Sequence, residues 1–203
     1  MNKLKYKVYN GNKIKGKFAE IENVIFLVMM ISGMIVGAFS AGKSDYLRNI
    51  AMQYLKFRNV TGFSEVFLKS AAVNFVFIAS SAFLGFSLIG SPFIYCIVFI
   101  KGMGTGALCG FLYFKYGFAG AGYAALTVFP PLIISFYALI MSCKDSAVYS
   151  LNAYEKAIRG RGHFENGETR VYLTRQLIYI IIAVFSSVID SLFVLLFSRF
   201  FSF

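Results

Sequence analysis

The stretch PFIYCIVFIKGMGTGALCGFLYF, residues 92–114, decides the fold that we expect for this chain. It is long and apolar enough to cross a bilayer, because about 20 helical residues span the hydrocarbon core. Gly102, Gly106 and Gly110 recur at every fourth position, so they lie on one side of a helix and form a shallow groove. A second helix can approach closely along such a groove, where van der Waals packing drives association in lipid. The stretch therefore predicts the centre of a transmembrane helix bundle.

A lysine interrupts this apolar stretch. If the helix begins near residue 93, Lys101 lies about 12 Å into the membrane, where an isolated cation costs several kcal/mol. Asp190 is the other ionisable residue well inside an apolar run. Three interpretations remain open: the two side chains pair and fix their helices, Lys101 snorkels to the interface, or both belong to a proton or ion path.

The composition is that of a membrane protein. The 203 residues are 58% hydrophobic and only 14% charged, which excludes an ordinary soluble domain. The net charge of +11 comes from Lys and Arg that flank apolar runs, so anionic lipid headgroups, rather than nucleic acid, are the expected counter-charge. Cys96, Cys109 and Cys143 have no CxxC spacing and His163 is the single histidine. We therefore expect no metal site, no cofactor and no enzymatic activity.

The apolar runs divide the chain into eight segments. These are a basic cytoplasmic tail (1–23), a first span (24–41), an outer amphipathic segment (42–70), a second span (71–90), a glycine-rich third span (92–114), a proline-kinked fourth span (118–142), a basic cytoplasmic loop (143–176) and a fifth span (177–198). The predicted fold is all-α: one polytopic bundle with about five spans and a short extracytoplasmic amphipathic helix. The first run also resembles a signal peptide, but its length favours a retained helix.

The distribution of basic residues predicts the orientation. The tail and the 143–176 loop together hold twelve Lys and Arg, against seven in the segments on the other side. The positive-inside rule then favours a cytoplasmic N-terminus and an external C-terminus in the bacterial cytoplasmic membrane.

Three further features are candidates for packing or binding. Asn74 is expected to form an interhelical hydrogen bond. Pro130 and Pro131 kink the fourth span, as a plain bend or as a gating hinge. In the outer segment, apolar residues at helical spacing predict either an interfacial helix that faces partner proteins or a loop helix packed on the bundle. Their leading members are Tyr46, Leu47, Ile50 and Tyr54.

Residues 84–131 resemble the stage II sporulation protein M family. The resemblance rests on a turn between two spans, a cationic residue followed by the glycine series, an aromatic-glycine connection and a proline in the next span. In this chain these are Lys101 with its three glycines, Tyr116-Gly117 and Pro130. Pro131, which doubles the proline, departs from the pattern.

The resemblance implies a non-enzymatic scaffold in endospore engulfment. Such a protein anchors peptidoglycan hydrolases resembling stage II sporulation proteins D and P at the septum, and it contacts membrane lipids; a homo-oligomer is left open. The expected working surfaces are segment 42–69 for partner ectodomains and the glycine groove for helix docking. The residues alone also admit a small transporter or permease subunit that uses Lys101 and Asp190.

Overall fold

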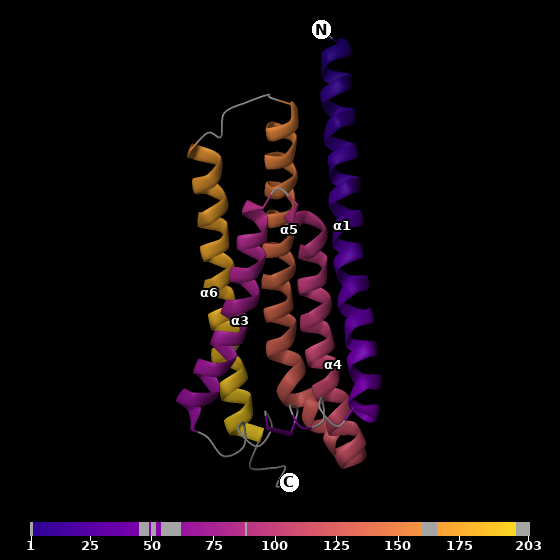
Figure 1. The fold of residues 1–203 in the computed structure, drawn as a ribbon, viewed down its shortest axis with the longest axis vertical. Helices are drawn as coiled ribbons and strands as arrows, with labels where there is room; N and C mark the ends of the chain where they lie inside the picture. The colour runs from indigo at the N-terminus through magenta and orange to yellow at the C-terminus, as the bar shows by residue number, and fades with distance from the viewer. Residues whose placement is uncertain are drawn as a thin grey trace.

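The computed structural model describes the backbone of residues 2–44, 49, 52, 53, 62–87, 89–159 and 166–197, and the side chains of all of these except 2–21, 155–159 and 166–168. All regular secondary structure in these ranges is helical (Figure 1). The elements are α1 (Asn2–Lys43), α3 (Phe63–Phe86), α4 (Gly90–Tyr123), the five-residue π-helix η1 (Ala124–Val128), α5 (Phe129–Arg159) and α6 (Asn166–Phe197). The predicted all-α class is confirmed.

Four stretches of the described chain are long and apolar enough to cross a membrane: Glu22–Lys43, Phe63–Phe86, Gly90–Tyr154 and Thr169–Phe197. The third has 65 residues, about twice what one crossing needs. It turns back at Gly117, whose φ of 60° and ψ of −138° are open to glycine and rare for other residues. Because its two arms run in opposite directions (Figure 1), the four stretches make five passes of a polytopic bundle.

The helices form a long bundle in which α1 lies on one side and α6 on the other (Figure 1). α1 packs chiefly against α4, whereas α6 packs against both α3 and α5. A tight turn joins α3 to α4, in which the Gly90 amide donates to the Ser87 carbonyl at 3.2 Å. The start of α1 and the end of α6 lie at opposite ends of the bundle.

Several helices continue beyond the spans that hydropathy indicates. α1 begins at Asn2 within the expected tail, α5 extends to Arg159, and α6 already begins at Asn166. Most of the expected 143–176 loop is therefore helical. The difference arises because hydropathy reports where the membrane ends, whereas Lys, Glu and Ala continue a helix into water.

Apolar side chains cover the outside of the bundle. Examples from every pass are Val28, Ile35, Phe39, Phe83, Phe93, Ile133, Ile181 and Phe185, all of them exposed. A soluble monomer rarely shows such a large apolar surface, whereas acyl chains are its natural surroundings. The outside of the bundle thus fits lipid.

The α-helix is interrupted immediately before the two prolines. Pro130 and Pro131 have no N–H, so two carbonyls in the preceding turn lose their helical partners. The chain forms η1 there, and the Phe129 amide donates to the Ala124 carbonyl in a π-helical pattern. The buried Thr127 hydroxyl donates to the Tyr123 carbonyl at 2.7 Å, one turn earlier in the same helix.

Candidate functional site

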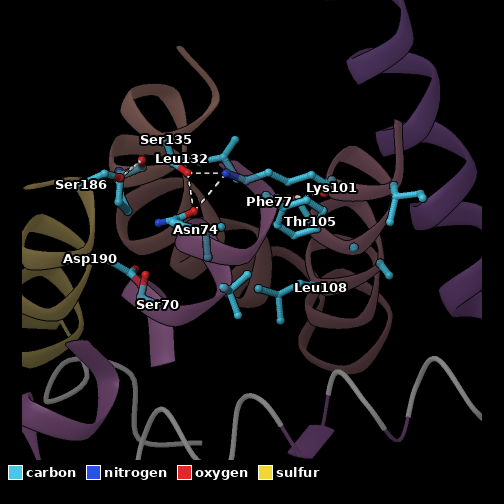
Figure 2. A pocket seen from close by; sticks show the side chains of 16 residues that line it. Ser70, Asn74, Phe77, Lys101, Thr105, Leu108, Leu132, Ser135, Ser186 and Asp190 are labelled. Carbon is cyan, nitrogen blue, oxygen red and sulfur yellow. Dashed lines mark hydrogen bonds between the residues drawn. The ribbon is translucent and has the colours of Figure 1, made fainter. Parts of the chain in front are cut away.

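A cavity of about 280 Å³ lies between α3, α4, η1, α5 and α6 (Figure 2). Its polar lining consists of Ser70, Asn74, Lys101, Thr105, Ser135, Ser186 and Asp190. The remainder of the lining is largely apolar and includes Val73, Phe77, Ile100, Leu108 and Leu132. The cavity therefore brings together the two ionisable residues well inside the spans and several neutral polar side chains.

Lys101 is the cation of this site, and its side chain is only 8% exposed. Figure 2 shows it extending from α4 toward Asn74 and Ser135. Its Nζ donates to Asn74 Oδ1 at 3.0 Å and also to Ser135 Oγ. The Ser135 hydroxyl in turn donates to Asn74 Oδ1 at 2.6 Å. These three side chains, which we call the Lys101 cluster, join α3, α4 and α5.

Asn74 connects the Lys101 cluster to the last helix as well. Its Nδ2 donates to Ser187 Oγ on α6 at 3.1 Å, and the Ser187 hydroxyl is itself held by the Ala183 carbonyl at 3.0 Å. A single asparagine thus makes hydrogen bonds to side chains of three other helices. Asn74 therefore forms interhelical hydrogen bonds, which stabilise helix bundles in membranes.

The Lys101 ammonium lies deep in the bundle. It is eleven residues after Gly90 and fifteen before Tyr116, or about 16 Å and 22 Å along the helix. Its Nζ also lies 5.6 Å from the ring centroid of Phe77 and 5.2 Å from that of Phe136. Neutral oxygens and aromatic faces therefore surround the charge in the interior, away from both ends of the span.

Asp190 lines the same cavity and is 6% exposed. Figure 2 shows it beside Ser70, on the other side of Asn74 from the Lys101 ammonium. Within the part of the chain that the structure describes, no ion pair joins Asp190 to Lys101. The two charges share a cavity, and the hydrogen bonds of Lys101 go to neutral side chains.

The cavity reaches the surface between α3 and α4. Val73 on α3 is 48% exposed and Ile100 on α4 is 51% exposed, although both line the cavity. Gly104 lies between these helices on the same side, and a Cβ added there would meet nothing within 4 Å. The opening therefore faces sideways out of the bundle.

The three glycines of the α4 groove lie against α1. A Cβ added at Gly102 would lie 2.6 Å from the Met30 carbonyl oxygen, and one at Gly110 would lie 2.7 Å from that of Ala38. Gly106 is similarly close to the Met34 carbonyl. This chain's own first helix fills the groove, so a helix of another protein cannot occupy it while α1 stays in place.

α1 contributes glycines of its own to this contact, which were not predicted from the sequence. Gly33 lies against the Phe99 carbonyl and Gly37 against that of Met103, so neither position has room for a side chain. Their four-residue spacing matches the series on α4 and is the signal that could have identified the partner helix. We call this double set of glycines the glycine contact.

A second buried polar network, which we call the serine seam, joins α3, α5 and α6. Ser81 and Ser142 lie 2.6 Å apart, and Ser142 donates to Gln176 Oε1 at 2.6 Å. Gln176 Nε2 reaches Ser146 Oγ at 3.1 Å, and Ser146 and the Tyr172 hydroxyl are 2.9 Å apart. This network was not predicted from the sequence: Ser142, Ser146 and Ser150 recur at every fourth position of α5, but that spacing alone does not identify their partners.

The remaining candidates are placed as follows. Pro131 lines the cavity and its carbonyl accepts a hydrogen bond from Ser186 Oγ at 2.6 Å, while Pro130 lies beside it at the start of α5. The outer-segment candidates lie outside the described residues; these are Tyr46, Leu47, Ile50 and Tyr54.

Comparison with known proteins identifies the family. The model of one family, stage II sporulation protein M, matches residues 25–198, which include all but the first three residues of the apolar stretches. No curated protein and no solved structure matches the chain. Because the matched region covers most of the 203 residues, this chain is a membrane protein that belongs to the sporulation-related stage II sporulation protein M family.

Proposed function

We propose that this protein is a non-enzymatic membrane scaffold for peptidoglycan remodelling during endospore engulfment. The observation that carries the proposal is the family match over residues 25–198, which covers the second half of α1 and all of the later helices. The partners would be peptidoglycan hydrolases resembling stage II sporulation proteins D and P, held at the septum by contact with this protein.

The packing of the bundle supports a structural role. Close backbone contact holds α1 to α4, and two networks of side-chain hydrogen bonds join α3, α5 and α6. Contacts of these kinds fix helices in one arrangement, which is what a platform for other proteins requires. Since α1 covers the glycine groove, we assign partner binding to the segment 42–69 and to the lipid-facing helix surfaces instead.

The proposed orientation has a cytoplasmic N-terminus and an external C-terminus. The excess of Lys and Arg in the tail and in residues 143–176 supports it, and so do the start of α1 and the end of α6 at opposite ends of the bundle (Figure 1). In this orientation segment 42–69 lies on the same side as the cell wall.

Crosslinking and affinity purification from membranes of sporulating cells test the scaffold. We expect single-pass peptidoglycan hydrolases to be recovered with the tagged protein, and to be lost when residues 45–58 are deleted. The control is Gly62→Ala, because a Cβ at this nearby exposed position would meet nothing within 4 Å. Recovery of both hydrolases with the deletion variant at normal membrane levels would refute the outer-segment assignment.

One observation favours a second candidate, a small transporter or permease subunit. Lys101 and Asp190 border one cavity well inside the spans, and intramembrane ionisable residues commonly mark a transport path. Co-purification of a nucleotide-binding ATPase in the same experiment would support this function. Normal engulfment by a folded Lys101→Met protein would argue against it and leave the scaffold in place.

A further inference from the structure

The opening of the cavity lies at the depth of lipid acyl chains. Val73 is ten residues after Phe63, so it lies about 15 Å from that end of α3. Ile100 lies on the facing helix, α4. It is ten residues after Gly90, the start of α4, which is again about 15 Å along the helix but from the other end of the bundle. An opening near the middle of two spans meets the hydrocarbon of the bilayer, and water has no direct route to it from the side.

The cavity changes from apolar to polar between its opening and its inner end. Val73 and Ile100 supply exposed apolar surface at the opening, whereas the side chains of the Lys101 cluster are buried between the helices. A volume of about 280 Å³ is near the lower end of the range for small-molecule pockets, roughly 300–1,000 Å³. The space therefore suits a polar head with the first part of a chain, while the rest of the chain remains in the lipid.

The charge at the inner end forms no ion pair with any described residue. Lys101 donates its two hydrogen bonds to the neutral oxygens of Asn74 and Ser135. An ammonium has a third N–H, and the Ser135 hydroxyl can rotate to donate as well as accept. An anionic oxygen at this point would complete the hydrogen bonding and neutralise a charge that is costly at this depth.

We propose that this cavity binds an acidic amphiphile that enters from the bilayer between α3 and α4. The acid group, a carboxylate or a lipid phosphate, lies against Lys101 and Ser135, and the alkyl chain leaves past Val73, Ile100 and Gly104. The limited volume of the cavity favours a small acidic head. This site is independent of the scaffold function.

Photolabelling tests the site. The full chain is purified into nanodiscs of zwitterionic lipid and exposed to a photoactivatable palmitic acid, or to a photoactivatable phosphatidic acid in a parallel arm. We expect one or both probes to label peptides containing residues 70–77 and 100–108. Unlabelled probe should compete, whereas hexadecanol should not. The arm that labels identifies the source of the acid group, and the absence of labelling in both arms would overturn the proposal.

Two variants, each with a matched control, separate acid recognition from general lipid contact. We expect Lys101→Met and Gly104→Leu to lower labelling about tenfold or more, because one removes the charge and the other blocks the opening. Lys115→Met and Gly122→Leu, on the same helix but outside the cavity lining, should leave labelling unchanged. If Lys101→Met does not fold, Gly104→Leu decides, because it keeps the Lys101 cluster intact. Undiminished labelling of a folded variant, or equal competition by hexadecanol, would overturn the proposal.

Discussion

Two faces of one helix associate with their neighbours in opposite ways. On one face of α4, glycines bring the α1 backbone into direct contact, without space for a methyl group. On the other face, Lys101 and Gly104 border a cavity, and hydrogen bonds between side chains join the helices. In lipid, helices lack the hydrophobic drive that assembles soluble bundles, so close packing and polar contacts must replace it. In this protein, close packing acts on the α1 side of α4, and polar contacts act on its cavity side.

The difference has a consequence for tolerance to mutation. The glycine contact involves backbone carbonyls on both helices, which cannot rotate away from an added atom as a side chain can. The cavity side contains open space and hydroxyls that can change partners. We therefore expect substitutions at the glycine contact to be destabilising by steric clash, and those on the cavity side to act through charge and hydrogen bonding.

The largest effect should come from adding one methyl group to the glycine contact. Gly106→Ala would place a Cβ against the Met34 backbone, so α1 must move away, at a loss of about 2–3 kcal/mol of unfolding free energy. The matched control is Gly104→Ala, two residues away in open space, which should be neutral or up to about 1 kcal/mol more stable. Unfolding in bicelles measures both, and equal stabilities of the two variants would refute the contrast.

A smaller effect is expected from removing the acceptor of the buried cation. Asn74→Leu deprives Lys101 of one of its two recorded hydrogen bonds and should lower the unfolding free energy by about 2 kcal/mol. Adding Lys101→Met should recover most of that loss, because no buried charge then lacks a partner. A double-mutant cycle measures the coupling. The cycle compares the loss in the double variant with the losses in Asn74→Leu alone and Lys101→Met alone. If the loss in the double variant equals the sum of the two single losses, the Lys101–Asn74 hydrogen bond does not carry the stability that we assign to it.

The glycine contact of α4 was easier to predict from the sequence than its cavity side. The series Gly102, Gly106 and Gly110 is visible in the sequence, since periodic spacing requires no knowledge of the partner. The identity of the partner helix was missed, although Gly33 and Gly37 carry the same spacing. The fold class, the membrane setting and the family also followed from the sequence.

The polar side was predicted less completely. Lys101, Asp190 and Asn74 stand out as polar residues in apolar runs, but hydropathy cannot say which of them meet. Their arrangement depends on how far each helix slides and rotates against the next, which places Ser135 next to Lys101. Serines are common in membrane helices because their hydroxyl can bond to their own backbone, so the serine seam gave no distinctive signal.

Within the serine seam, a still smaller effect is expected. Gln176→Leu removes hydrogen bonds to Ser142 and Ser146 and should lower the unfolding free energy by about 1 kcal/mol, typical of such bonds in membranes. Thr174→Val is the control, because this exposed hydroxyl donates only to the Arg170 carbonyl of its own helix and should change stability little. The comparison uses the same unfolding measurement, and equal effects would show that the seam contributes no more than a local bond.

The smallest effect should come from the partly exposed ion pair beside the serine seam, between α5 and α6. Arg175 Nη1 lies 3.5 Å from Asp145 Oδ1, and the arginine side chain is 58% exposed. Such a pair is screened by solvent and salt, so Arg175→Ala should change the unfolding free energy by less than about 0.5 kcal/mol. Asp145 also keeps its hydrogen bond from the Tyr179 hydroxyl at 2.8 Å, which leaves the carboxylate partnered. A loss above about 1 kcal/mol that persists in high salt would mean that Arg175 acts through packing of its alkyl stem. Arg175 would then stabilise the protein through the contact area of its side chain rather than through its charge, in contrast to the buried Lys101 cluster.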